Sequence, residues 1–328
     1  MMKGISRLPR PDAALQLRLK NRSRTLLWKL LRAFFLIGFC FVILYPVLMM
    51  LSKAFMSRED LYDRSVLLLP RSFTLDNVKT AIKQLDYWSS LWNSLWVATV
   101  VSVLQTLSCL LVGYGFARFE FLFKKLLFAM VILTLIIPPQ LTILSSFLQF
   151  QFFDIFGIIR AINGRGINLI GGVTPLVILA CTCMGLKNGL FIYLFRQIFK
   201  GMPRETEEAA YVDGASTFRI FYSVMLPGAI SAIVTVLLFS FVWQYNDLLI
   251  TSTYVKNFKL LPMMYSSLGA VDYTAVGIGG ASLSDFDWQY TAMIRSTGVL
   301  LMILPVVILY IIAQRYFVEG IERSGLVG

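Results

Sequence analysis

The 328-residue sequence contains no histidine, only four cysteines and few charges, with 15% of its residues being Asp, Glu, Lys or Arg. Without histidine, neither a Ser-His-Asp triad nor a histidine-based zinc site can form. The sequence also lacks a G-x-x-x-x-G-K-[ST] loop for nucleotide phosphates. No catalytic group or metal site is therefore predicted, and no disulfide framework, because the cysteines all fall in apolar stretches and should behave as small apolar side chains: Cys40, Cys109, Cys181 and Cys183.

Hydrophobic residues make up 57% of the chain and the mean hydropathy is +0.72, which excludes an ordinary soluble domain. A helix needs about 20 apolar residues to cross a bilayer. Six uncharged stretches have roughly that length: 33–52, 91–117, 126–153, 167–186 (continuing past Lys187 to 195), 228–246 and 296–314. The sequence predicts an all-α polytopic membrane protein with six transmembrane helices.

Basic residues near span ends are retained in the cytoplasm. With the N-terminus inside, 18 Lys and Arg residues fall in cytoplasmic segments and 10 in the opposite ones. Both termini are therefore predicted to be cytoplasmic, with a basic leader at 1–32, a transmembrane domain at 33–314 and a tail at 315–328. The leader is expected to meet anionic lipid headgroups, not nucleic acid, and to precede an uncleaved anchor.

Two outer connections are long, residues 53–90 and 251–290, and the second contains a glycine-rich segment at 276–282. Loops of that length are uncommon unless they bind something, so this one is either a plain surface loop or a surface for an external substrate carrier. Within the third apolar stretch, Pro138 and Pro139 interrupt the backbone hydrogen bonds. A kinked or broken helix is expected there.

A polar segment at 203–227 separates the fourth and fifth apolar stretches. Pro203 favours a helix start, and three acids suit the positive end of that helix: Glu205, Glu207 and Glu208. Gly214 favours a left-handed helix end, and Ser216 favours the cap of a second helix that Pro227 would end. The segment therefore predicts a helix, a glycine turn and a second helix.

Small residues in this segment would allow a partner to approach closely, and aromatic residues flank them. The small residues are Ala209, Ala210, Gly214 and Ala215, and the aromatic ones are Tyr211, Phe218, Phe221 and Tyr222. An exposed patch of this composition is typical of an interface.

The segment resembles the permease family of binding-protein-dependent ABC importers, whose signature is E-A-A, three residues, G, nine residues, I, one residue, L-P. The spacing is intact here, with Val224 in place of Ile. The resemblance implies that the loop couples the chain to an ATPase subunit, which would hold ATP and Mg²⁺, while this chain binds no cofactor. The residues that it assigns to coupling are Glu208, Ala209, Ala210, Asp213, Gly214, Leu226 and Pro227.

Residues 30–328 further resemble the carbohydrate branch of that family, especially the maltose-type second permease, through the segments 113–119, 195–199, 243–247 and 314–320. The resemblance implies import of an oligosaccharide or related carbohydrate by alternating access. It implies as partners a second permease subunit, two ATPase subunits and an extracytoplasmic solute-binding protein. A contact between the tail at 321–328 and the ATPase is suggested by the same resemblance.

Polar residues inside the predicted spans are candidates for the substrate path, because charges there are costly and usually face an interior route or a partner. The candidates are Lys187 and Asn188 in the fourth stretch, and Trp243, Tyr245, Asn246 and Asp247 at the end of the fifth. Lys187 would bind a sugar hydroxyl or an acidic sugar, or would pair with a carboxylate of the partner subunit. Trp243 and Asp247 share a helix face and Tyr245 points elsewhere, so not all of them can line one path. Membrane-interface aromatics are the alternative for this group.

Three further functions compete with a carbohydrate importer. An ABC importer for another solute would share every feature of the loop. A secondary transporter driven by an ion gradient would need membrane-buried acids, and apart from Asp247 the spans contain none. An intramembrane enzyme is disfavoured because the spans hold no clustered acid–base pair.

Overall fold

The computed structural model describes residues 11–268 and 287–325, and this part of the chain consists of helices, connecting loops and isolated β-bridges. The all-α prediction is confirmed for these residues. The glycine-rich segment at 276–282, the first ten residues and residues 326–328 lie outside the described residues. The chain forms two compact units, Met1–Thr74 and Leu75–Gly328.

The first unit contains two helices, α1 (Pro11–Phe55) and α2 (Arg58–Tyr62). The apolar part of α1, Thr25–Phe55, is long enough to cross a membrane and buries none of its apolar window within the chain. A helix that is apolar all round and has no protein cover is expected to lie in lipid. The apolar part of α1 includes the whole of the first predicted stretch, 33–52, and extends beyond both of its ends.

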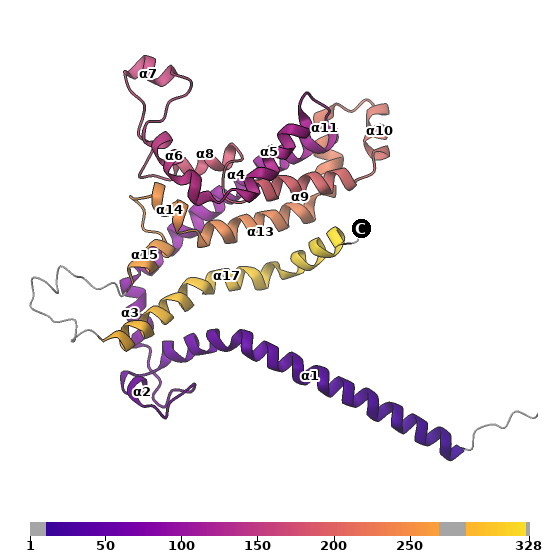
Figure 1. Ribbon diagram of the computed structural model, residues 1–328, viewed down its shortest axis with the longest axis vertical. Helices are drawn as coiled ribbons and strands as arrows, with labels where there is room; N and C mark the ends of the chain where they lie inside the picture. Colours follow the sequence, from indigo (N-terminus) through magenta and orange to yellow (C-terminus); the bar gives the residue numbers. More distant parts are fainter. Residues whose placement is uncertain (1–10, 269–286, 326–328) are drawn as a thin grey trace, which may run out of the picture. The chain divides into compact units, whose positions relative to one another are not determined.

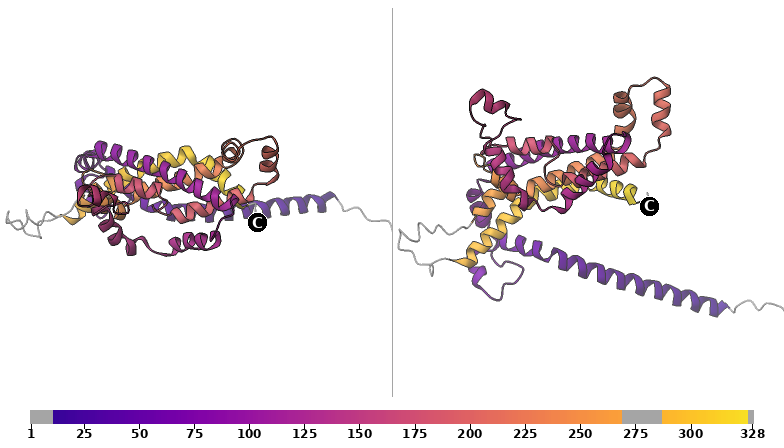
Figure 2. Two further views of the ribbon diagram at one scale, coloured as in Figure 1. Left: turned by 90° about the horizontal axis from the view of Figure 1, so that it is seen from above. Right: turned by 45° about the horizontal axis from the view of Figure 1, so that its top comes forward.

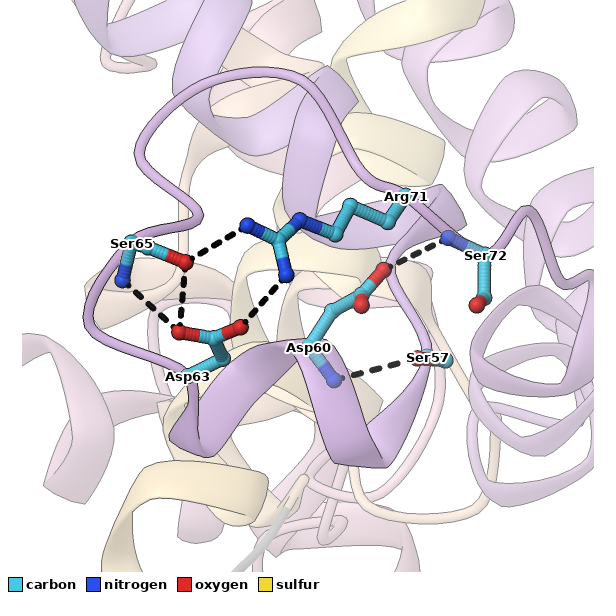
Figure 3. Close-up of polar contacts among 6 residues, drawn as sticks. All are labelled: Ser57, Asp60, Asp63, Ser65, Arg71 and Ser72. Atoms are coloured by element: carbon cyan, nitrogen blue, oxygen red, sulfur yellow. Dashed lines mark hydrogen bonds and ion pairs between the residues drawn. The ribbon is translucent and has the colours of Figure 1, made fainter.

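A polar cluster organises the loop after α1, with hydrogen bonds and one ion pair among Ser57, Asp60, Asp63, Ser65, Arg71 and Ser72 (Figure 3). Asp63 accepts bonds from the backbone N–H and hydroxyl of Ser65, and the Arg71 guanidinium donates to it over 2.9 Å. These donors, led by the Ser65 hydroxyl, hold the pKa of Asp63 below its usual range. The loop at 57–72 is therefore held in a defined conformation by its own side chains.

The second unit is built around α4 (Tyr87–Arg118), which packs against α8 (Thr174–Cys181), α9 (Asn188–Gly201) and α13 (Ile230–Asn246) (Figure 1). The buried positions of α4 recur at three- and four-residue spacing, as a helix with one covered face requires. Its opposite face exposes three tryptophans at four-residue spacing: Trp88, Trp92 and Trp96. α17 (Trp288–Gly325) packs against α13, α3 (Asp76–Gln84) and α15 (Leu261–Ser267).

The remaining helices are short or paired. They are α5 (Lys124–Ile136), α6 (Pro139–Gln151), α7 (Ile158–Asn163), α10 (Glu205–Val212), α11 (Thr217–Ile220), the π-turn η1 (Phe221–Met225), α12 (Leu226–Gly228) and α14 (Leu249–Tyr254). Within the second unit, α10 and α11 project at one end and α7 projects at the other (Figure 2). The predicted proline break is confirmed, because α5 and α6 meet at Pro138 with a bend of 105°.

Among the described residues, three helices meet the length and composition of a span: Thr25–Phe55, Tyr87–Arg118 and Trp288–Gln314. Two bent pairs, α5 with α6 and α11–α12 with α13, raise the number to five if each is one span. The fourth predicted stretch is not a single helix, since residues 182–187 separate α8 from α9. The fourth predicted stretch therefore forms two helices with a break between them.

Candidate functional site

The predicted helix–turn–helix at 203–227 is confirmed in its main features. α10 begins at Glu205, directly after Pro203 and Arg204, and ends at Val212. Gly214 follows in the left-handed region with φ +77°, and α11 begins at Thr217. The side chain of Ser216 accepts a hydrogen bond from the Arg219 N–H and so caps α11.

Two backbone hydrogen bonds explain why a glycine stands at 214. The Gly214 N–H donates to the Tyr211 carbonyl, and the Ala215 N–H donates to the Ala210 carbonyl, each over 3.0 Å. This is the Schellman arrangement, which closes a helix through a left-handed residue. A side chain added at 214 would meet no neighbouring atom within 4 Å, so the requirement for glycine there comes from the backbone conformation.

The second helix of the loop ends one residue later than the sequence predicts. It runs without interruption through η1 and past Pro227 to Gly228, and turns by 76° at Ala229 into α13. Proline has no N–H to donate, and the π-turn just before it shifts the pairing so that the Leu226 N–H donates to the Phe221 carbonyl. Pro227 is therefore accommodated in the helix and does not end it.

The surface of the loop combines acids with exposed apolar side chains. Glu208, Ala209, Asp213, Gly214 and Pro227 are exposed, while Ala210 and Leu226 are half-buried. The exposed apolar side chains are Val212, Phe218, Tyr222 and Tyr211, with exposed fractions of 88%, 78%, 67% and 48%. This loop surface has a composition that is typical of protein–protein interfaces.

Phe221 departs from the predicted aromatic flank, because its ring points into the protein. Its centroid lies 4.8 Å from that of Tyr114 on α4 and 6.5 Å from that of Phe199 on α9. Ala210 and Ala215 also pack against this apolar cluster. One side of the loop thus rests on the helical unit and the other side faces outward.

The sequence analysis missed a buried ion pair beneath the loop. Arg118, the last residue of α4, contacts Glu207 of α10, with 2.5 Å between Nε and Oε1. The same guanidinium donates to the carbonyl of Met202, at the end of α9, over 2.9 Å. Glu207 was assigned only to the favourable end of the helix, because 89 residues separate it from its partner and no local pattern joins them.

Lys187 and Trp243, predicted from two different spans, lie together. Lys187 stands in the gap between α8 and α9 in a left-handed conformation, with φ 59°. Its ammonium nitrogen lies 5.9 Å from the centre of the Trp243 ring on α13, within the range of a cation–π contact. Lys187 is exposed and Trp243 is half-buried, so the pair offers a cation and an aromatic face at one place.

A second feature that the sequence analysis missed is the polar contact network that fills the gap between α8 and α9. Gln105 of α4 donates to the Leu186 carbonyl and to the Asn188 side chain, and accepts a bond from the Ser240 hydroxyl of α13. Ser108, one turn along α4, donates to the Ala180 carbonyl over 2.6 Å. Side chains of α4 therefore donate to backbone carbonyls at both ends of the break between α8 and α9.

The other candidates for the substrate path do not share the contact of Lys187 with Trp243. Tyr245 is 2% exposed and donates to the Met302 carbonyl of α17, so it belongs to the interior. Asn246 is exposed and donates to the carbonyl of Val242 on its own helix. Asn188 is buried against Gln105.

Asp247 has a structural contact that its type alone did not indicate. Its carboxylate accepts bonds from the N–H and hydroxyl of Thr251, each over 2.7 Å, at the start of α14. Its carboxylate therefore binds free donors in the first turn of the helix that follows α13.

Comparison with known proteins supports the family resemblance that the loop indicates. A family model described as the inner membrane component of binding-protein-dependent transport systems matches residues 109–323. The arabinooligosaccharides transport system permease protein AraQ of Halalkalibacterium halodurans is 26% identical over 314 residues, covering 94% of this chain and 99% of AraQ. The maltodextrin transport system permease protein MdxG of Bacillus subtilis is 27% identical over 289 residues, covering 88% and 92% of the two chains.

A solved structure shares the fold. It is a bacterial ABC transporter involved in the import of the acidic polysaccharide alginate, and it matches with a TM-score of 0.65 and 20% identity. The match covers 89% of this chain and 96% of that chain. The resemblance drawn from residues 208–227 is thereby confirmed for both sequence family and fold.

Proposed function

The chain belongs to the family of inner-membrane components of binding-protein-dependent transport systems, and from this premise we propose that it is the permease subunit of an ATP-driven carbohydrate importer. Its place is the cell membrane, in agreement with its apolar helices. The carbohydrate assignment is supported by the two sugar-transport relatives, AraQ and MdxG, which match over nearly their whole length. Translocation is by alternating access, with no chemical step in this chain.

The observation that carries the coupling is the outward-facing surface of α10 and α11. Its exposed apolar side chains and the acids Glu208 and Asp213 suit a cleft in a second protein, and the family signature runs through it. The partner is an ATPase subunit that holds ATP and Mg²⁺, present in two copies. A second permease subunit and an extracytoplasmic solute-binding protein complete the importer.

The proposed topology has six spans and cytoplasmic termini. The spans are α1, α4, α5 with α6, α8 with α9, α11 to α13, and α17. In support of this arrangement, α7 and the loop of α10 and α11 project at opposite ends of the second unit (Figure 1), as an outer and a cytoplasmic segment should. The excess of Lys and Arg on the N-terminal side of the membrane supports the same orientation.

The proposed substrate path passes the exposed Lys187 and the ring of Trp243. An aromatic face stacks on the C–H face of a sugar, and an ammonium group donates to its hydroxyls. The 5.9 Å between the Lys187 ammonium and the Trp243 ring supports a joint role. Asn246 is an exposed amide on the same helix end, whereas Tyr245 and Asp247 act as supports of the helices around it.

The ATPase assignment is tested by copurification and by ATP hydrolysis in the reconstituted complex, with maltodextrins and arabinooligosaccharides as transport probes. Gly214→Asp and Glu208→Lys are expected to reduce ATPase retention and sugar uptake by roughly tenfold or more, since each alters the centre of the docking surface. If both variants retain the ATPase and transport like the wild type, the docking assignment is wrong.

Matched controls separate docking from damage to the fold. Gly157 has φ +85° and open space around it, like Gly214, so Gly157→Asp imposes the same backbone cost at the other end of the unit. Asp76 is an exposed acid on α3, so Asp76→Lys reverses a charge away from the loop. Both controls are expected to retain the ATPase.

A further inference from the structure

The ion pair between Arg118 and Glu207 differs from the others in the described part of the chain. Its two side chains are 6% and 12% exposed. Every other ion pair whose geometry the structure gives there has at least one side chain that is 47% exposed or more. A surface pair contributes little to stability, whereas breaking a buried pair leaves an unpaired charge in the interior.

Arg118 joins three segments at the point where α4 ends. Its Nε contacts Glu207 in the first turn of α10, and its Nη2 donates to the Met202 carbonyl at the end of α9. One turn earlier on α4, the Tyr114 ring packs edge-on against Phe199, 5.2 Å between centroids, and also contacts Phe221 of η1. The end of α4 is thus attached to both sides of residues 203–227, the proposed docking loop.

α4 also connects several helices of the second unit. It packs against α8, α9 and α13, and its Gln105 holds the gap beside Lys187. Arg118 Nε and Glu207 Oε1 make no hydrogen bond, so the two groups interact as buried opposite charges, and the bond from Nη2 to the Met202 carbonyl orients the guanidinium. Stability alone does not require such a pair, since apolar residues of similar volume are often as stable.

We propose that Arg118 and Glu207 are positioning residues that link the docking loop to α4, so that a displacement of α10 by the ATPase moves α4 and, with it, the α8–α9 gap. The inference rests on the proposed docking of an ATPase on α10 and α11. In this arrangement the outward side of α10 receives the force, and Glu207, on its inward side, passes it to the membrane helices.

The first test is Glu207→Gln, which keeps the size of the side chain and removes its charge. In the reconstituted complex with its ATPase and solute-binding protein, we expect normal ATPase retention and basal ATP hydrolysis. Uptake of the sugar that the wild-type complex transports is expected to fall roughly tenfold, in the range of coupling between distant sites. The control is Glu120→Gln, which breaks the neighbouring pair of the exposed Glu120 with Lys124 and should leave uptake unchanged.

A double variant separates coupling from stability. Arg118→Met with Glu207→Met removes both charges and keeps apolar volume, so no unpaired charge is buried. We expect its melting temperature in detergent to return toward that of the wild type while uptake stays low. If uptake recovers together with the melting temperature, or if Glu207→Gln transports normally, the pair is only a structural contact and the inference is overturned.

These outcomes are distinct from a failure of the proposed function. Docking fails when Gly214→Asp and Glu208→Lys leave ATPase retention and uptake intact. The link fails alone when those two variants lose the ATPase but Glu207→Gln transports like the wild type.

Discussion

Lys187 is held in a left-handed conformation beside the Trp243 ring, and its ammonium group is accessible. A left-handed non-glycine residue costs of the order of 1 kcal/mol, and the cost is met where the surrounding structure fixes the conformation. Here the bonds from Gln105 to Leu186 and Asn188 fix the residues on both sides of the lysine. The position of the cation is therefore set by its neighbours and not by its own preference.

Lys187→Met is expected to reduce sugar uptake roughly tenfold through a higher KM, because a hydrogen bond from a charged donor to the sugar is lost. Assembly of the complex should be unchanged. The measurement is the concentration dependence of uptake by the reconstituted complex. If Lys187 instead pairs with a carboxylate of the second permease subunit, copurification of that subunit falls and the KM does not change.

A matched control exists for this substitution. The Lys256 ammonium lies 5.7 Å from the Phe147 ring, almost the same geometry as the pair of Lys187 with Trp243. Lys256→Met therefore removes a similar cation–π contact elsewhere and should not alter the KM. Equal effects of the two substitutions would remove Lys187 from the substrate path.

At the scale of the helices, the gap between α8 and α9 depends on contacts with other helices. Residues 182–187 carry two left-handed non-glycine residues, Cys183 and Lys187, which local sequence does not favour. Gln105 and Ser108 of α4 donate to the carbonyls of Leu186 and Ala180 at the two ends of the gap. The gap is thus a tertiary feature.

Gln105→Leu is expected to destabilise the second unit by about 2 kcal/mol, because the part-buried Leu186 carbonyl and the buried Asn188 amide lose a partner. The measurement is thermal unfolding of the purified complex, with hydrogen exchange at residues 182–190. The control is Thr99→Val on the exposed face of α4, where the hydroxyl bonds only to the Leu95 carbonyl of its own helix. Equal stability of the two variants would contradict a role of Gln105 in holding the gap.

The difference between local signals and contacts with other helices explains what the sequence could predict. The docking loop was predictable because its signals are local: Pro203 before the helix, Gly214 at its end and Ser216 as a cap. The fourth helix was not, because an uncharged stretch shows its length but not the side chains of α4 that replace its backbone bonds. The pairing of Arg118 with Glu207 could not be predicted for the same reason, because a contact between residues 89 positions apart leaves no periodic pattern in the sequence.

At the scale of the whole chain, the proposed topology depends on the α8–α9 segment crossing the membrane. α8 has 8 residues and α9 has 14, so neither crosses alone at 1.5 Å per residue. Together with the connecting residues they have the length of a span. Whether they form one decides on which side α7 and the docking loop lie.

Two single cysteines resolve this point, in a background where the four native cysteines are changed to alanine. Phe156→Cys lies at a fully exposed position before α7, and Glu205→Cys lies at the exposed start of α10. With a crossing at α8–α9, a membrane-impermeant maleimide labels the first only from outside and the second only from the cytoplasmic face of inverted vesicles. Labelling of both from one side would mean that the segment re-enters without crossing. The docking loop and the outer loops would then share a face, and an ATPase bound to α10 could not be cytoplasmic while the solute-binding protein reached α7 from outside.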